Sequence, residues 1–77
     1  MPTSFIDGYK FRFYSSDANE PPHVHVIKAE NVAKIWLGPV ELENNRGYNR
    51  SELNRVLKLT ELHRAELLEA WNEHFDR

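Results

Sequence analysis

Two histidines one residue apart carry the clearest chemical signal in this chain. His23 and His25 lie in the segment Pro-Pro-His-Val-His-Val, which begins at Pro21. Because residues two apart on a β-strand point to the same side, their imidazoles should project side by side. Such a pair can bind one divalent metal ion, zinc or nickel, or can act as general acid and general base on a phosphodiester. Asp17, a few residues earlier, is the candidate for a third catalytic group.

A metal site needs more ligands than this pair supplies, since protein sites commonly use three or four. His63 is the candidate for a further metal ligand. It lies at the edge of an apolar stripe on a predicted helix, where a partly buried structural histidine is the favoured interpretation. A pair of ordinary surface histidines explains the His23 and His25 motif without any metal.

Composition narrows the classes of protein that the chain can belong to. It has 77 residues, 10 Lys+Arg, 12 Asp+Glu and a formal net charge of −2. The chain has no cysteine, which excludes disulfide scaffolds, iron–sulfur clusters and cysteine nucleophiles. Its charge argues against a strong generic nucleic-acid binder. No apolar run approaches the roughly 18 residues of a membrane span, and no signal peptide is evident, so we expect a cytoplasmic protein.

Hydrophobic periodicity predicts the elements that hold these residues. Alternation predicts strands at about 9–14, 23–28 and 32–37, with a further short strand at about 40–43. One long helix is predicted at about 50–75, capped by Asn49, because a single apolar stripe keeps its phase from Leu53 to Phe75. We therefore expect one α+β domain over 1–77, an antiparallel meander of three to four strands packed against one C-terminal helix. Trp71 is the expected anchor of that helix.

The register of the strands decides which residues face the helix. A two-residue turn at Glu30 and Asn31 would place Val26 opposite Ile35 and His25 opposite Trp36. The helix-covered face would then carry six apolar residues: Phe11, Phe13, Val24, Val26, Ile35 and Leu37. The other face would carry a mixed set: Lys10, Arg12, Tyr14, His23, His25, Ile27, Lys34 and Trp36.

That second face is the candidate binding surface. A monomeric domain seldom leaves large apolar side chains exposed together without a partner. The predicted binding residues are two aromatic and three cationic side chains, Tyr14, Trp36, Lys10, Arg12 and Lys34. Aromatics and cations on a sheet also suit stacked bases and phosphates, so nucleic acid remains a weaker alternative.

Several segments together resemble a known family. They are the opening Met-Pro-Thr, the strand at 8–11, Asp17, the histidine motif at 21–26, and the run Leu-His-Arg-Ala-Glu-Leu-Leu-Glu-Ala-Trp at 62–71. Together they resemble the domain of unknown function 4160 family of small bacterial proteins. The family's marked positions fall on Asp17, His23, His25, His63 and Trp71. The family pattern has a histidine directly after the loop aspartate, where this chain has Ala18, so a metal site here would lack a ligand.

The resemblance implies a protein encoded beside another small domain in a toxin–antitoxin-like gene pair. The leading hypothesis is therefore an interaction protein that binds a partner encoded nearby, or a second copy of itself, through the open face centred on His23, His25 and Trp36. The alternatives are a small nuclease that uses His23 and His25, and a divalent-metal-binding protein. Whether the chain is an enzyme stays open at this point.

Overall fold

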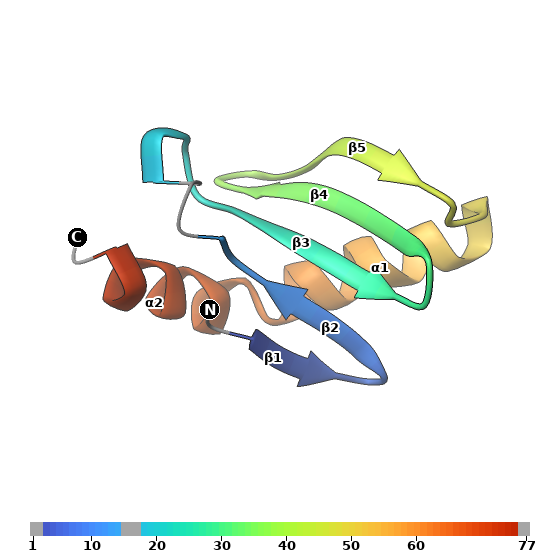
Figure 1. The fold of residues 1–77 in the computed structure, drawn as a ribbon, viewed down its shortest axis with the longest axis horizontal. Helices are drawn as coiled ribbons and strands as arrows, with labels where there is room; N and C mark the ends of the chain where they lie inside the picture. The colour runs from blue at the N-terminus through green and yellow to red at the C-terminus, as the bar shows by residue number, and fades with distance from the viewer. Residues whose placement is uncertain (1–2, 15–17, 76–77) are drawn as a thin grey trace.

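The computed structural model describes residues 3–14 and 18–75, which form a sheet with two helices across one of its faces (Figure 1). The strands are β1 (Thr3–Ile6), β2 (Tyr9–Arg12), β3 (His23–Lys28), β4 (Asn31–Leu37) and β5 (Val40–Arg46). The helices are α1 (Arg50–Leu62) and α2 (Arg64–Phe75). All neighbouring strands are antiparallel, in the order β1-β2-β3-β4-β5. The predicted α+β meander is confirmed, with five strands instead of three or four.

The strand missed by sequence analysis is β1. Its four residues, Thr-Ser-Phe-Ile, are too few to show a clear alternation. A tight turn at Asp7 and Gly8 joins β1 to β2, and both residues have positive φ, at 53° and 86°. These are the values that a two-residue hairpin turn of type I′ requires. Two other strands differ from the prediction in length. The strand predicted at 9–14 ends at Arg12 in the structure, and the strand predicted at 40–43 extends to Arg46.

The predicted register between β3 and β4 is wrong by two residues. The turn lies at Ala29 and Glu30, so that Lys28 pairs with Asn31. Asn31 is instead the first residue of β4, and its side chain lies against Gly47, where an added Cβ would clash with the Asn31 Oδ1. A shift of two residues preserves the alternation of a strand. The two faces were therefore predicted correctly, although the cross-strand partners were not.

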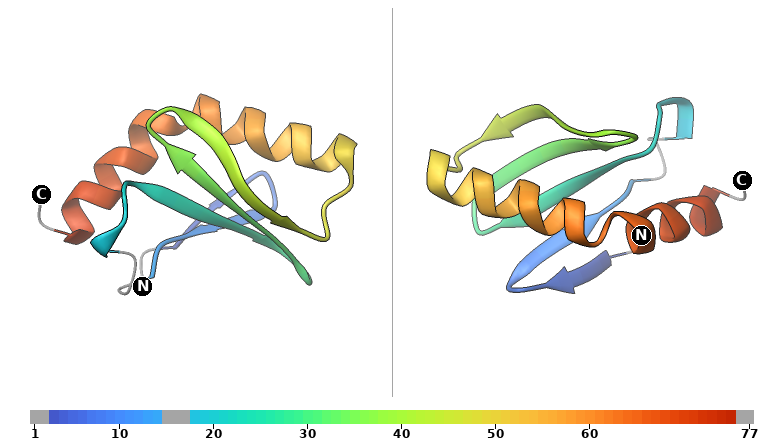
Figure 2. Two further views of the ribbon diagram at one scale, coloured as in Figure 1. Left: turned by 90° about the horizontal axis from the view of Figure 1, so that it is seen from above. Right: turned by 180° about the vertical axis from the view of Figure 1, so that it is seen from behind.

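The predicted single helix is divided at His63, whose φ of −105° and ψ of 14° interrupt the α-helical geometry. Figure 2 shows α2 bending away from the direction of α1. Arg64, the first residue of α2, donates a hydrogen bond from Nε to the carbonyl of Leu37 at the end of β4. This contact fastens the start of α2 to the sheet. The predicted cap is confirmed, since the Asn49 side chain accepts a hydrogen bond of 2.8 Å from the Glu52 N–H.

The core lies between the helices and the covered face of the sheet. All six residues predicted for this face are buried, together with Tyr9, Ala33, Tyr48, Val56, Leu67 and Trp71. Trp71 is 1% exposed and meets the Phe13 ring edge-on at a centroid distance of 5.4 Å. Trp71 is thus buried between α2 and the sheet, as expected, and its contribution to stability stays a prediction.

Candidate functional site

The open face of the sheet is organised in rows that cross the strands. The central row contains Thr3, Arg12, His25, Lys34 and Asn44, each opposite the next on its neighbouring strand. The row nearer the β3–β4 turn contains Phe5, Lys10, Ile27, Val32 and Arg46. A third row pairs His23 with Trp36 and Trp36 with Glu41. Because opposite residues of an antiparallel pair share a face, the register gathers four cations and His25 on one surface.

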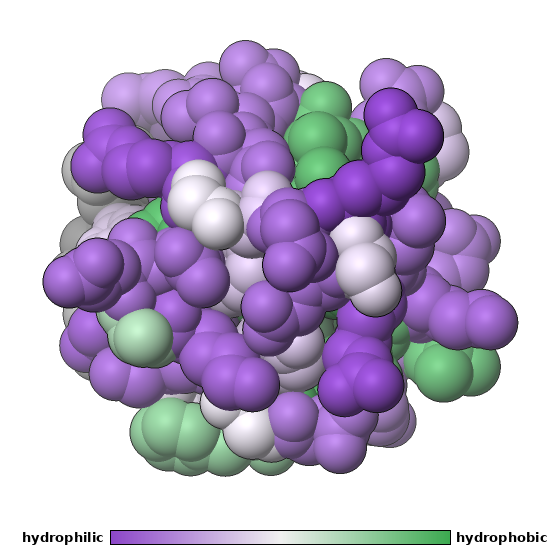
Figure 3. Space-filling view, turned by 90° about the vertical axis from the view of Figure 1, so that its right-hand side faces the viewer, coloured by the Kyte–Doolittle hydropathy of each residue, from purple (hydrophilic) through white to green (hydrophobic). Residues whose placement is uncertain are grey.

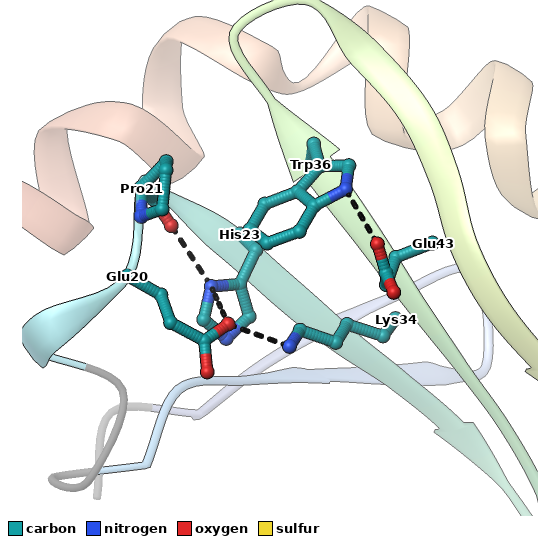
Figure 4. A network of polar contacts seen from close by, with 6 residues as sticks. All are labelled: Glu20, Pro21, His23, Lys34, Trp36 and Glu43. Carbon is teal, nitrogen blue, oxygen red and sulfur yellow. Dashed lines mark hydrogen bonds and ion pairs between the residues drawn. The ribbon is translucent and has the colours of Figure 1, made fainter.

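His23 does not lie open on this surface as predicted. Its side chain is fully buried, with its ring centroid 5.4 Å from that of Trp36 and 5.2 Å from that of Trp71. The Nδ1 atom lies 2.9 Å from the carbonyl oxygen of Pro21 (Figure 4). His23 therefore links the end of the sheet to α2. His23 is on the same side of β3 as His25, as the alternation predicted. The sequence alone did not show that Trp71 of α2 would contact and bury His23.

His25 is half-buried and lies in the middle of the central row. Its ring is 5.1 Å from that of His23 and 4.8 Å from that of Tyr14, measured between centroids. The predicted pairing of His25 with Trp36 is wrong, because the register places His25 between Arg12 and Lys34. His25 thus has a cationic residue as its cross-strand partner on each side of its row.

Two acidic residues that sequence analysis did not single out hold the neighbouring side chains. The Lys34 Nζ lies 2.6 Å from Glu20 Oε1 and 5.0 Å from the centre of the Trp36 ring. The Trp36 Nε1 donates a hydrogen bond of 3.0 Å to Glu43 Oε2 (Figure 4). Glu43 falls at the irregularity where the β4–β5 register shifts, which the sequence did not signal. Trp36 is consequently half-buried and held on two sides.

A hollow of about 190 Å³ opens beside Lys34 on this face. It is lined by residues of β3, β4 and β5: His25, Val32, Lys34, Asn44 and Arg46. A second hollow, of about 240 Å³, lies at the start of α1 and is lined by Asn49, Ser51, Glu52 and Arg55. Figure 3 views the end of the molecule where the β3–β4 turn and the start of α1 lie, and its surface is mostly hydrophilic. The first hollow belongs to the predicted binding face, and Asn44 and Arg46 add to the residues predicted there.

The remaining predicted binding residues are on the open face as expected. The Lys10 Nζ lies 5.9 Å from the centre of the Phe5 ring, and the Arg12 guanidinium carbon lies 5.6 Å from that of Tyr14. All three predicted cations, Lys10, Arg12 and Lys34, are half-buried, which is typical of long side chains that lie along a sheet.

The candidate metal ligands are only partly brought together. His23 and His25 are neighbours, whereas His63 lies at the junction of the two helices with its Nδ1 3.4 Å from Glu66 Oε1. Asp17 lies outside the described residues. Across 3–14 and 18–75, no three His, Cys, Asp or Glu side chains gather closely enough to hold a metal ion.

Comparisons with known proteins locate the chain in one family. The model of the family described as Domain of unknown function (DUF4160) matches residues 8–72, which contain β2 through most of α2. No match was found among curated proteins or among solved structures. None of the helices in the described residues is long and apolar enough to cross a membrane. Because the match covers most of the sequence, including His23, His25, His63 and Trp71, the chain belongs to the DUF4160 family.

Proposed function

We propose that this chain is a small binding protein that docks a partner protein on its open sheet face, as one member of a toxin–antitoxin-like pair. The observation that supports this most strongly is the asymmetry of the sheet. Both helices pack on one face, while the other face carries three half-buried cations beside half-buried Ile27 and Val32. Aromatic residues and arginine are enriched at protein interfaces, and this face carries Tyr14, Trp36 and Arg12.

Burial of His23, one of the catalytic candidates, makes a nuclease the weaker interpretation. His23 is fully buried and its Nδ1 faces a backbone carbonyl, so it does not present an acid or base to a substrate. Trp36 is likewise engaged by Lys34 and Glu43, which leaves less of its ring for stacking on a base. A protein partner requires neither a free imidazole pair nor a free indole face.

The proposal is tested by measuring binding to the product of the adjacent gene by calorimetry. Ile27→Ser removes an apolar side chain from the middle of the face without adding charge. We expect it to weaken binding about tenfold, or about 1.4 kcal/mol, because full burial of such a side chain is worth about 1.5–3 kcal/mol and Ile27 is already half-buried in the free protein. Lys58→Ser, on the exposed side of α1, is the matched control and should bind like the wild type.

Two results would overturn the proposal. The first is equal binding by the Ile27→Ser and Lys58→Ser variants. The second is a failure of the wild-type protein to bind at all. A dimeric mass that Ile27→Ser reduces to a monomeric one would instead assign the face to a second copy of this chain.

A further inference from the structure

We infer that the hollow on the open face receives a carboxylate side chain from an acidic segment of the partner protein, held by Lys34 and Arg46. This inference rests on the proposed function and specifies the chemistry of the partner. The hollow is lined by His25, Val32, Lys34, Asn44 and Arg46.

The geometry of the three strands places different chemical groups on different sides of the hollow. Val32 of β4 is opposite Arg46 of β5, and Lys34 of β4 is opposite Asn44 of β5. Two cations and an amide thus come from two adjacent strands, and His25 closes the side toward β3. The volume corresponds to roughly six water molecules at about 30 Å³ each, which is room for the end of an Asp or Glu side chain.

The balance of charge on the hollow favours an anion. Lys34 pairs with Glu20, which is 44% exposed and lies at the rim of the face. Among the ion pairs of the described residues, none involves Arg46 or Arg12. Arg46 is exposed, and a guanidinium can bind a carboxylate through two parallel hydrogen bonds. An incoming carboxylate would therefore meet an unneutralised cation at Arg46 and share Lys34 with Glu20.

An acidic protein segment fits this face better than a nucleic acid does. Glu20 and Glu43 contact side chains of the face, and Glu41 is opposite Trp36 in the third row. Three carboxylates so near the hollow would repel a backbone with a phosphate at every nucleotide. A peptide can place one carboxylate in the hollow and neutral or apolar side chains over Ile27 and Trp36. The formal net charge of −2 also disfavours long-range attraction of a polyanion.

The inference is tested by nuclear magnetic resonance on the full ¹⁵N-labelled chain, with three probes of equal length. They are a ten-residue peptide of Gly and Ser with one central Glu, the same peptide with Gln in place of that Glu, and decauridylate. We expect the acidic peptide to shift the amide signals of the five lining residues, and the Gln peptide to leave them unchanged. Arg46→Gln should weaken binding of the acidic peptide at least fivefold, while Lys58→Gln, a matched loss of one exposed cation, should not.

Several outcomes would overturn the inference. These are no shift at millimolar acidic peptide, equal shifts with the Gln peptide, and stronger binding of decauridylate, which would assign the face to nucleic acid. Failure of the inference is distinguishable from failure of the proposed function. If binding of the adjacent gene's product is weakened by Ile27→Ser but unaffected by Arg46→Gln, the face binds a partner without this carboxylate contact. If Ile27→Ser has no effect, the proposed function itself is wrong.

Discussion

His23 is the residue at which a chemical role and a structural role compete most directly. It is fully buried against the rings of Trp36 and Trp71, whereas His25 is half-buried in the central row of the open face. We expect His23→Ala to lower the free energy of unfolding by about 2–4 kcal/mol, through lost packing and lost hydrogen bonding. His25→Ala should cost less than about 1 kcal/mol, because surface changes are usually small. Urea unfolding of both variants measures the difference. Equal stability of the two would show that the packing of His23 adds little.

The buried hydroxyl of Tyr48 should make the stability of the protein depend on pH in alkaline solution. This hydroxyl donates a 3.0 Å hydrogen bond to the Val26 carbonyl, and burial, with Tyr9 and Glu52 nearby, raises its pKa to about 12. An unfolded tyrosine has a pKa of about 10, so between these values the unfolded chain releases a proton that the folded chain keeps. Tyr48 therefore contributes full stability below pH 10. That contribution should fall by up to about 1.4 kcal/mol per pH unit as the pH rises from about 10 to 12.

Urea melts between pH 8 and pH 12, on the wild type and on Tyr48→Phe, check this expectation. The variant should start lower by about 1–3 kcal/mol, because the Val26 carbonyl loses its donor. It should then lose less stability than the wild type as the pH rises. Some alkaline loss should remain, since burial and the hydrogen bond to Glu52 also raise the pKa of Tyr9. Parallel curves for the two proteins would contradict the assignment to Tyr48.

At the scale of elements, Trp71 is the largest side chain that α2 buries against the sheet. Trp71 is 1% exposed and contacts the rings of Phe13, His23 and Phe75. Trp71→Ala should cost about 3–5 kcal/mol, which is most of the stability of a domain this small. We expect the variant to be largely unfolded at 37 °C, so that circular dichroism shows no cooperative melt above this temperature. Trp71→Phe, which keeps an aromatic ring, should still melt cooperatively. A Trp71→Ala melt within a few degrees of the wild type would show that the anchor lies elsewhere.

The elements also show where sequence reasoning succeeded and where it could not. The two faces of the sheet followed from alternation alone, because a slip of two residues between β3 and β4 leaves each side chain on its own face. The break at His63 has no such signal. The apolar stripe keeps its phase across the break. The residue that follows the break, Arg64, donates its hydrogen bond to the Leu37 carbonyl, 27 residues away in the sequence.

The candidate site was predictable to a similar extent. Lys10, Arg12 and Lys34 were placed on the open face by period-two alternation. Alternation could not place Glu20 at this face, because its pairing with Lys34 depends on how the chain before β3 lies against β4. The burial of His23 depends on the position of α2 in space. Local patterns therefore predict faces, while contacts between distant segments decide which residues on those faces are accessible.

At the scale of the whole molecule, stability should be concentrated away from β1. None of the fully buried core residues belongs to Thr3–Ile6, and Ile6 is the β1 residue that packs against the core as a partly buried side chain. Phe5 is 73% exposed, and the family match begins at residue 8, after β1. The covered faces of β2 to β5, with the two helices, therefore contain the elements needed for a cooperative core.

Two truncations test this distribution of stability. Removal of residues 1–7 deletes β1 and the partly buried Ile6, which should cost about 1–2 kcal/mol. At about 4–8 °C per kcal/mol for a domain of this size, the melting temperature should fall by roughly 4–16 °C while the transition stays cooperative. Removal of residues 64–77 deletes Leu67 and Trp71 from the core and the Arg64 contact with Leu37, and should abolish the transition. Thermal melts followed by near-ultraviolet circular dichroism distinguish these results. If the chain without residues 1–7 shows no cooperative transition, pairing of β1 with β2 is essential to the fold, and the sheet cannot end at β2.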